Sequence, residues 1–218
     1  MDYSDTTVII PIKDEPAAEQ VARKVRGALP GCKIIVIYKG SADFGLRNRN
    51  LRLIKQTGSG KGNAVKQAAR YVNTDILCFI DGDGTYKVGD LRKLIAMVRD
   101  GADMALGNRM YDISERVMPK YIQFGNNVLT ATGNLLYGLK IHDSQTGLRA
   151  LRTGVFKGLG LRETHFGIES EMNIKCRKGH YKIVETPTKY YIRVGVSKQF
   201  KLVDGLKLFF LNFKLLFG

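Results

Sequence analysis

The chain has 218 residues, of which 44% are hydrophobic and 25% charged, a composition typical of a globular protein with a sizeable core. Its net charge is +15, and from Lys175 to the end ten Lys or Arg residues face only two acidic ones, which favours a phosphate-rich partner: a nucleotide, a phospholipid surface or a nucleic acid. The sequence shows no signal peptide and no uncharged apolar stretch of about 18 residues, so we expect neither secretion nor a membrane-spanning helix.

Short apolar runs alternate with helical segments along the first half of the chain. The expected strands are 6–10, ended by Pro11, then 33–38, 50–56, 75–80 and 104–106; the expected helices are 15–28, 61–72 and 88–99. This alternation predicts an α/β fold with a mostly parallel sheet flanked by helices.

The second half predicts helices over 119–137 and 168–178 and a strand over 182–185. No repeat or linker is visible, so we expect one domain over 1–199, followed by a specialised C-terminal region. Three widely spaced cysteines, Cys32, Cys78 and Cys176, imply no disulfide framework and fit a reducing cytosolic setting.

Two carboxylates follow the apolar run that ends at Ile80. Asp81 and Asp83 are two residues apart, so on an extended chain their side chains can point the same way. Gly82 and Gly84 let a ligand approach the backbone. Paired carboxylates at a strand end suit Mg²⁺ or Mn²⁺, with a substrate phosphate supplying further ligands. The alternative is an ordinary surface turn, where Asp-Gly pairs are common.

A glycine-rich loop, TGSGKGNA over residues 57–64, opens the helix expected at 61. Helix N-termini attract phosphate, and Lys61 adds a positive charge. The spacing is not that of a P-loop, and no GxGxxG follows the first strand, so a dinucleotide-binding fold is not supported. The alternative is a flexible loop with a helix cap.

Further polar residues lie in the second half of the chain. Glu169 and Glu171 face different directions on their expected helix, and we expect one of them to be only solvated. Arg193 and Lys198 place two cations five residues apart on one loop, where the alternative is an ordinary surface charge.

The order of these segments resembles the glycosyltransferase family 2 enzymes of the GT-A fold, and among them the dolichyl- or polyprenyl-phosphate sugar synthases. The resemblance covers about residues 6–200. The segments that carry it are VIIPIKDE (8–15), GSAD (40–43), GKGNA (60–64), DGD (81–83), GNR (107–109), DSQTGLR (143–149) and ETPTKYYIRVGVSK (185–198).

The resemblance implies a GT-A (Rossmann-like) sheet and inverting, metal-dependent transfer of a hexose or N-acetylhexosamine. The donor would be a UDP- or GDP-sugar and the acceptor dolichyl or polyprenyl phosphate, at the cytoplasmic face of a membrane. Mg²⁺ or Mn²⁺ would be held by Asp81 and Asp83. The expected catalytic residues are Asp83, Arg109, Asp143 and Arg149; the donor residues are Pro11, Glu15, Asp43, Lys61, Asp81, Arg193 and Lys198; the acceptor residues are Lys120 and Gln123.

The chain departs from the family pattern at Tyr38 and Lys39, where relatives carry two acids, and at Thr85, where some mannosyl-transferring members carry Gln. The base of the donor nucleotide and its sugar therefore stay open. An acceptor phosphate is largely dianionic at neutral pH and needs no strong general base. Accordingly, no catalytic role is assigned to the histidines, His142, His165 and His180.

Residues 200–217 form an apolar stripe at helical spacing, with Lys residues on the other side. The stripe comprises Leu202, Val203, Leu206, Phe209, Phe210, Phe213, Leu216 and Phe217. Such a basic amphipathic helix predicts a peripheral membrane-interface element over 200–218, and 119–138 is the expected acceptor or interface helix. The alternative is a terminal helix docked on the core or in a dimer.

Three other functions stay open: a family 2 enzyme with a non-lipid acceptor, a sugar nucleotidyltransferase, and a basic nucleic-acid-binding protein. The nucleotidyltransferase lacks the expected Gly- and Arg-rich loop after the first strand. Nucleic acid is not an expected partner, because paired aspartates repel phosphate unless a metal is present. The oligomeric state is left open.

Overall fold

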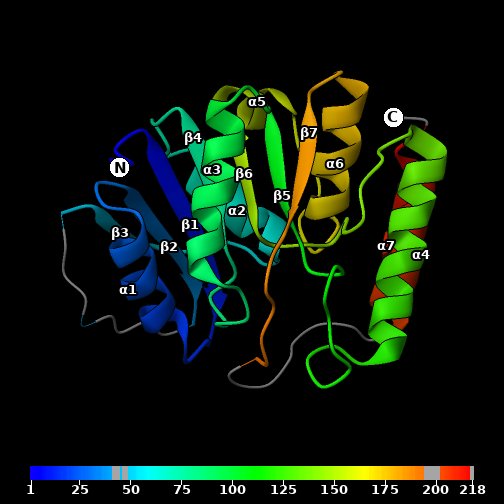
Figure 1. The fold of residues 1–218 in the computed structure, drawn as a ribbon, viewed down its shortest axis with the longest axis horizontal. Helices are drawn as coiled ribbons and strands as arrows, with labels where there is room; N and C mark the ends of the chain where they lie inside the picture. Colours follow the sequence, from blue (N-terminus) through cyan, green and yellow to red (C-terminus); the bar gives the residue numbers. More distant parts are fainter. Residues whose placement is uncertain (41–44, 46–48, 194–201, 217–218) are drawn as a thin grey trace.

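The computed structural model describes residues 1–40, 45, 49–193 and 202–216. Its centre is a seven-stranded sheet with the strand order β3-β2-β1-β4-β6-β5-β7 (Figure 1). The strands are β1 (Thr6–Lys13), β2 (Lys33–Lys39), β3 (Leu51–Lys55), β4 (Ile76–Phe79), β5 (Met104–Asn108), β6 (Arg149–Arg152) and β7 (Ile183–Pro187). All are parallel except β6, which runs antiparallel to both β4 and β5. The expected mostly parallel α/β fold is confirmed.

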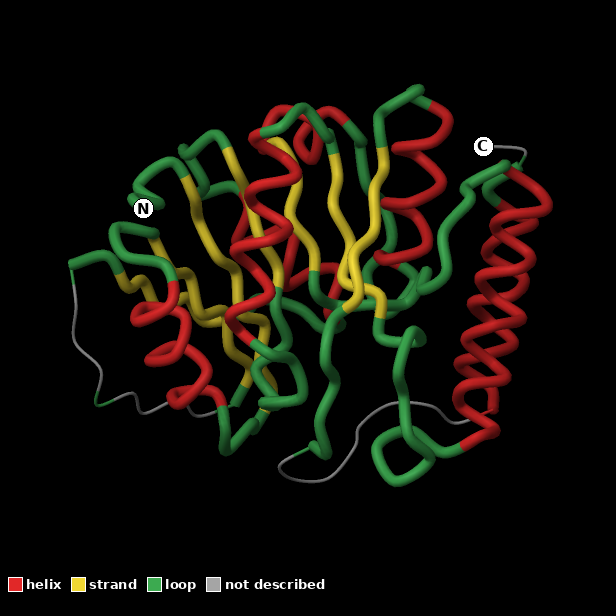
Figure 2. The backbone as a smooth tube through the Cα atoms, in the orientation of Figure 1, coloured by secondary structure: helices red, strands yellow, loops and turns green. Residues whose placement is uncertain are grey.

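Helices cover both faces of this sheet. They are α1 (Ala18–Ala28), α2 (Lys61–Ala69), the short 3₁₀ helix η1 (Val88–Asp90), α3 (Leu91–Arg99), α4 (Lys120–Tyr137), α5 (Thr153–Gly158), α6 (Ile168–Lys178) and α7 (Leu202–Lys214). Helices α1 and α3 pack on one face, and α2, α5 and α6 pack on the other, giving two apolar cores separated by the sheet (Figure 2). The two cores hold the C-terminal edge of the sheet in a fixed geometry.

Helices α4 and α7 lie against each other beside α6, at the end of the sheet nearest β7 (Figure 1). Their contact is a small apolar cluster centred on Leu129, Leu208 and Leu211. Asn212 adds polar contacts, donating to the carbonyl of Leu129 and accepting at its own carbonyl from the Tyr137 hydroxyl. Across the described residues, no helix is long and apolar enough to cross a bilayer.

Apart from the short helix α5, which was not predicted, the structure differs from the predicted elements in two places. Strand β1 does not end at Pro11 but runs on to Lys13. Its pairing with β4 already stops at Ile9, so Pro11 lies beyond the part of β1 that pairs on both sides. Beyond that point the missing N–H of Pro11 interrupts no strand pairing with β4, while pairing with β2 continues. The second difference is β6, a strand over residues expected only as a polar turn with its continuation.

Candidate active site

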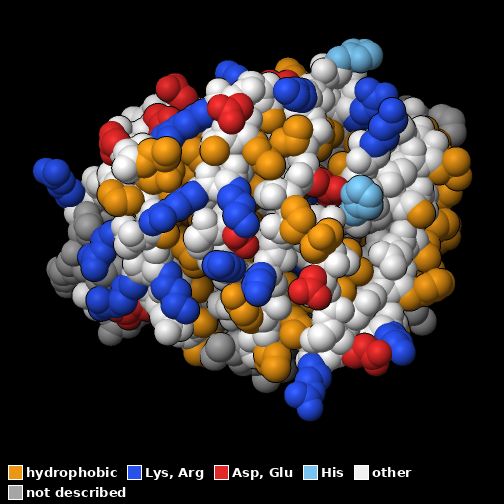
Figure 3. Space-filling view, in the orientation of Figure 1, with side chains coloured by type: hydrophobic (Ala, Val, Ile, Leu, Met, Phe, Trp, Pro, Cys, Tyr) orange, Lys and Arg blue, Asp and Glu red, His pale blue; other side chains and the backbone are white. Residues whose placement is uncertain are grey.

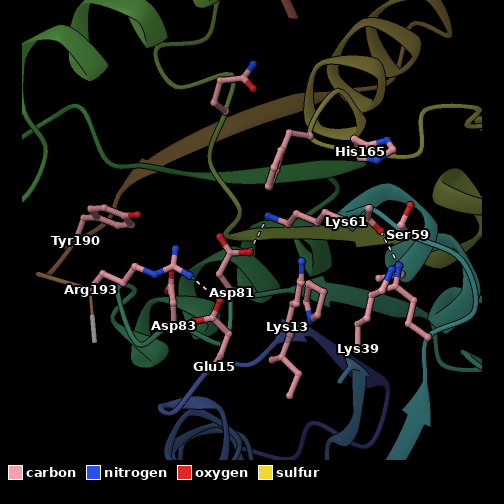
Figure 4. Close-up of a pocket in the computed structure, with 18 of the residues that line it drawn as sticks. Lys13, Glu15, Lys39, Ser59, Lys61, Asp81, Asp83, His165, Tyr190 and Arg193 are labelled. Atoms are coloured by element: carbon pink, nitrogen blue, oxygen red, sulfur yellow. Dashed lines mark hydrogen bonds and ion pairs between the residues drawn. The ribbon is translucent and has the colours of Figure 1, made fainter. Parts of the chain in front are cut away.

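The candidate site lies where β1, β2 and β4 end at the carboxyl edge of the sheet. The chain order switches at β1, since β2 lies on one side and β4 on the other. Crevices at such switch points are the usual ligand sites of open α/β sheets. Here a cavity of about 310 Å³ is present, and its walls include both predicted metal-binding carboxylates, Asp81 and Asp83 (Figure 4).

Asp81 is bound by Lys61, which stands at the first turn of α2. The Lys61 Nζ lies 2.6 Å from Asp81 Oδ1 and 2.8 Å from Glu169 Oε1. Burial disfavours the ammonium charge, but the two carboxylates outweigh it and raise the pKa of Lys61 above its usual value. Lys61 therefore remains a fixed positive charge inside the cavity.

Asp83 is bound by Arg193, in the segment after β7. Arg193 Nη1 lies 3.1 Å from Asp83 Oδ2, and Arg193 Nη2 lies 2.6 Å from Glu15 Oε1. The backbone N–H and hydroxyl of Thr85 both donate to Asp83 Oδ1. Burial and the nearby charge of Asp81 raise the pKa of Asp83, against the opposing effects of Thr85 and Arg193. Each of the two predicted carboxylates is thus paired with a positively charged side chain, which an anionic ligand could also contact.

The loop after α4 leaves room beside the first carboxylate. A Cβ built at Gly147 would lie 2.3 Å from Asp81 Oδ2, so only glycine leaves this oxygen its space. Oxygen ligands of this kind fit Mg²⁺ or Mn²⁺. Among the described residues no cluster of three or more His, Cys, Asp or Glu side chains is arranged for a metal, so remaining ligands would come from substrate or water.

A second pocket of about 280 Å³ adjoins the first, and Arg109 lines both. Arg109 Nε and Nη2 donate to the two oxygens of Asp143, at 2.7 and 2.8 Å. The Arg109 guanidinium also lies 5.2 Å from the ring centre of Tyr190. Burial opposes its charge, but Asp143 holds the pKa of Arg109 well above its usual value. A rigid cation is therefore fixed in the wall between the pockets.

Arg149 is placed differently from Arg109. Its side chain is only 1% exposed, and it lines neither pocket. Its guanidinium donates to the carbonyls of Ser144 and Thr146 and to the side chain of Asn173. These bonds fix the 143–147 loop from beneath.

The two predicted acceptor residues lie near the second pocket but do not line it. Lys120 is exposed and pairs with Glu115 at 2.9 Å, and Gln123 donates to the carbonyl of Met118. Instead, α4 presents Tyr121, Ile122 and Asn126 to this pocket.

Of the predicted donor residues, Pro11 and Glu15 line the first pocket together with Lys61, Asp81 and Arg193. The predictions for Asp43 and Lys198 lie outside the described residues.

Several residues of the first pocket were not predicted as site residues, among them Lys13, Lys39, His165 and Tyr190 (Figure 4). The family departure at Lys39 was visible in the sequence, but its position on the pocket wall was not.

One expectation about the acidic pair on α6 is wrong. Glu169 and Glu171 do face different directions, but neither is solvated: they are 4% and 1% exposed. Glu169 binds Lys61, whereas Glu171 accepts from the backbone N–H groups of Arg162 and Glu163. The α6 N-terminus packs beneath a loop, and its charges are neutralised there, which spacing along a helix cannot reveal.

Comparison with known proteins identifies the family. The sequence profile described as glycosyl transferase family 2 matches residues 7–160. The chain belongs to glycosyl transferase family 2. This confirms the resemblance drawn from the order of the sequence segments.

Family 2 relatives include two proteins of Haloferax volcanii. Glycosyltransferase AglJ is 32% identical over 165 residues, covering 73% of this chain and 54% of AglJ. Dolichyl-phosphate hexose transferase is 28% identical over 200 residues, covering 90% of this chain and 87% of that protein. This chain therefore spans about half of the length of AglJ.

The fold is shared with glucosyl-3-phosphoglycerate synthase from Mycobacterium tuberculosis. A crystal structure of that enzyme with Mn²⁺, UDP-glucose and glycerol 3-phosphate has a TM-score of 0.62 at 15% identity, covering 93% of this chain and 74% of that one. The GT-A fold is confirmed. The family 2 match ends at residue 160, so Glu169 and Arg193 lie beyond it.

Proposed function

We propose that this family 2 protein transfers a hexose or N-acetylhexosamine from a nucleotide sugar to dolichyl or polyprenyl phosphate, with inversion at the anomeric carbon. The observation that carries the proposal is the pair of adjoining pockets, with carboxylates and cations in the first and Arg109 in the wall between them. The relative named dolichyl-phosphate hexose transferase supports the choice of acceptor.

The first pocket is the proposed donor site. Asp81 and Asp83 would hold Mg²⁺ or Mn²⁺, which when bound neutralises charge on the donor diphosphate. Lys61 and Arg193 already contact these carboxylates and would turn part of their charge toward the diphosphate. Fixed cations at this position stabilise the charge that builds up on the leaving nucleoside diphosphate.

Arg109 is the proposed contact of the acceptor phosphate. An oxygen of that phosphate attacks the anomeric carbon, the bond from that carbon to the diphosphate oxygen breaks, and the nucleoside diphosphate leaves with the electron pair. The acceptor is largely dianionic at neutral pH, so no proton has to be removed. Asp143 and Arg149 would act on this step only by positioning Arg109 and its loop.

The outer faces of α4 and α7 support a peripheral attachment to a membrane. Helix α7 buries Leu208 and Leu211 against α4, while Leu206 and Phe210 of the predicted stripe are 52% and 65% exposed. Figure 3 shows apolar side chains gathered at the edge of the molecule formed by α4. Apolar side chains facing outward on a basic helix are typical of membrane-interface elements. We propose attachment at the cytoplasmic face, where the acceptor headgroup would enter beside α4.

The test is a transfer assay with a panel of UDP- and GDP-sugars, Mn²⁺ or Mg²⁺, and two acceptors, a polyprenyl phosphate and a water-soluble phosphate monoester. We expect a glycosylated lipid phosphate with at least one donor, lost on adding EDTA and restored by the metal. Transfer only to the soluble acceptor would overturn the lipid assignment. Release of pyrophosphate from a sugar 1-phosphate and a nucleoside triphosphate would point to a nucleotidyltransferase instead.

A further inference from the structure

Unsatisfied buried polar groups concentrate at the second pocket. Among the described residues, five buried side-chain atoms lack a hydrogen-bond partner, and three of them belong to residues that line this pocket. They are Glu169 Oε2, Asn126 Oδ1 and Arg193 Nε. Buried polar groups are normally hydrogen-bonded, so such a concentration indicates a polar ligand.

Glu169 is the most informative of the three. Its carboxylate is half used, because Oε1 binds Lys61 at 2.8 Å while Oε2 has no partner in the described part of the chain. An Asn amide can present either its oxygen or its nitrogen, but a carboxylate can only accept. What completes the Glu169 site must therefore be a hydrogen-bond donor.

This requirement excludes the phosphate groups of both substrates from the position beside Glu169. A dianionic phosphate offers no donor and is repelled by a buried carboxylate. A sugar hydroxyl donates one hydrogen bond and carries no charge. Glu169 also lies between the two phosphate positions, since Lys61 connects it to Asp81 in the first pocket and Arg109 shares the second pocket with it.

We infer that Glu169 forms the subsite for the transferred sugar and that its Oε2 accepts a hydrogen bond from a hydroxyl of that ring. The inference rests on the proposed function and adds the class of sugar: a neutral hexose or N-acetylhexosamine with a free hydroxyl toward α6, and not a uronic acid. The same carboxylate keeps the two phosphates apart, on the Lys61–Arg193 side and on the Arg109 side.

The test compares binding of a nucleoside diphosphate with binding of its sugar conjugate, for Glu169→Gln and the parent protein. Calorimetric titrations with Mn²⁺ use UDP, UDP-glucose and UDP-N-acetylglucosamine, with GDP and GDP-mannose as the second series. We expect Glu169→Gln to bind the nucleoside diphosphate with an affinity within about twofold of the parent protein. We expect it to bind the sugar conjugate about tenfold more weakly than the parent, which is the effect of losing one charge-assisted hydrogen bond.

Glu171→Gln is the matched control, because Glu171 lies on the same helix, is equally buried and lines neither pocket. This variant should lower the melting temperature without changing the ratio between the affinity for the nucleoside diphosphate and the affinity for its sugar conjugate. A second measurement uses UDP-glucuronate, which the parent should bind at least tenfold more weakly than UDP-glucose, with Glu169→Gln narrowing that ratio.

Two outcomes would overturn the inference while leaving the proposed function intact. Equal weakening of diphosphate and sugar conjugate would show that Glu169 acts only by placing Lys61. Unchanged affinity for both would show that Oε2 meets no ligand. A parent protein that binds diphosphates and no sugar conjugate in either series would instead contradict the proposed function itself, and the inference with it.

Discussion

At the scale of single residues, the candidate site is a set of ion pairs that a substrate can reorganise. Lys61 and Arg193 each contact two carboxylates, three of them in the first pocket and the fourth, Glu169, in the second. Buried charges of this kind are costly when one partner is removed, because the other is left uncompensated. The proposed donor diphosphate and metal would give these cations and carboxylates new partners of opposite charge, so binding would leave no charge uncompensated.

Removing the second metal-binding carboxylate is the first prediction. Asp83→Ala should lower transfer at least about 100-fold, the usual loss when a preorganised electrostatic group is removed. Arg193 keeps its ion pair with Glu15 in this variant, so the loss leaves no uncompensated charge and the melting temperature should change little. Initial rates with saturating metal measure the effect. The control is Asp75→Ala, an exposed aspartate one residue before β4, and equal rates in the two variants would refute the metal assignment.

At the scale of elements, loops rather than strands complete the site. The loop from Asp143 to Gly147 approaches the end of β4 so closely that Gly147 leaves no space for a side chain beside Asp81. Arg149, at the start of β6, holds this loop through backbone carbonyls. The antiparallel β6 thus brings a distant segment to the carboxylates.

We therefore predict that Gly147→Ala lowers activity more than tenfold, because the added Cβ must displace the Asp81 carboxylate. Gly154→Ala is the matched control: a Cβ there meets nothing within 4 Å, and alanine in helix α5 should stabilise it by up to about 1 kcal/mol. Transfer rates and melting temperatures of both variants are the measurement. Full activity of Gly147→Ala would mean that the loop is not held against Asp81.

The outer face of α7 gives a prediction about the membrane. Replacing Leu206 and Phe210 together by Gln should reduce co-sedimentation with anionic vesicles severalfold, because both side chains are exposed and would insert between lipids. Melting temperature should hardly change, since the contact with α4 uses other residues. Leu53→Gln, on the exposed edge strand β3, is the control and should sediment like the parent. If the α7 variant sediments with vesicles like the parent, attachment to the membrane through α7 is refuted.

At the scale of the whole molecule, two cores share one sheet, and each contains free cysteines. Cys32 and Cys78 lie in one core and Cys176 in the other, all buried. Burial raises the pKa of Cys32 and of Cys176 to about 12 and that of Cys78 further. Since the thiolate is the reactive form, these thiols are protected while the fold is intact.

We expect no cysteine to react with a disulfide reagent at pH 8 in the native protein, and all three to react in denaturant. The reagent is a disulfide that releases a coloured thiol when it reacts with a cysteine. The measurement is the absorbance of this released thiol at increasing urea concentrations. If the cores unfold together, the three thiols become reactive in a single transition that coincides with loss of circular dichroism. Fast reaction of any thiol without denaturant would contradict its burial.

What the sequence determined by itself follows from short-range rules. Alternating apolar runs predict the strands and helices, and the spacing of Asp81 and Asp83 predicts that both reach one ligand, because side chains alternate along an extended chain. The glycine-rich loop predicts Lys61 at the start of a helix, where a phosphate can bind. Ordered along the chain, these segments were enough to predict the family.

Only the tertiary structure decided which charges meet. Glu169 appeared to be one of two ordinary helix carboxylates, yet it binds Lys61, more than 100 residues earlier in the chain. Asp143 and Arg149 belong to the same sequence segment, and both are buried and line neither pocket. Helix periodicity also could not tell which side of α7 would face α4, because both sides carry leucines. Such choices depend on packing between distant segments, and no local pattern records them.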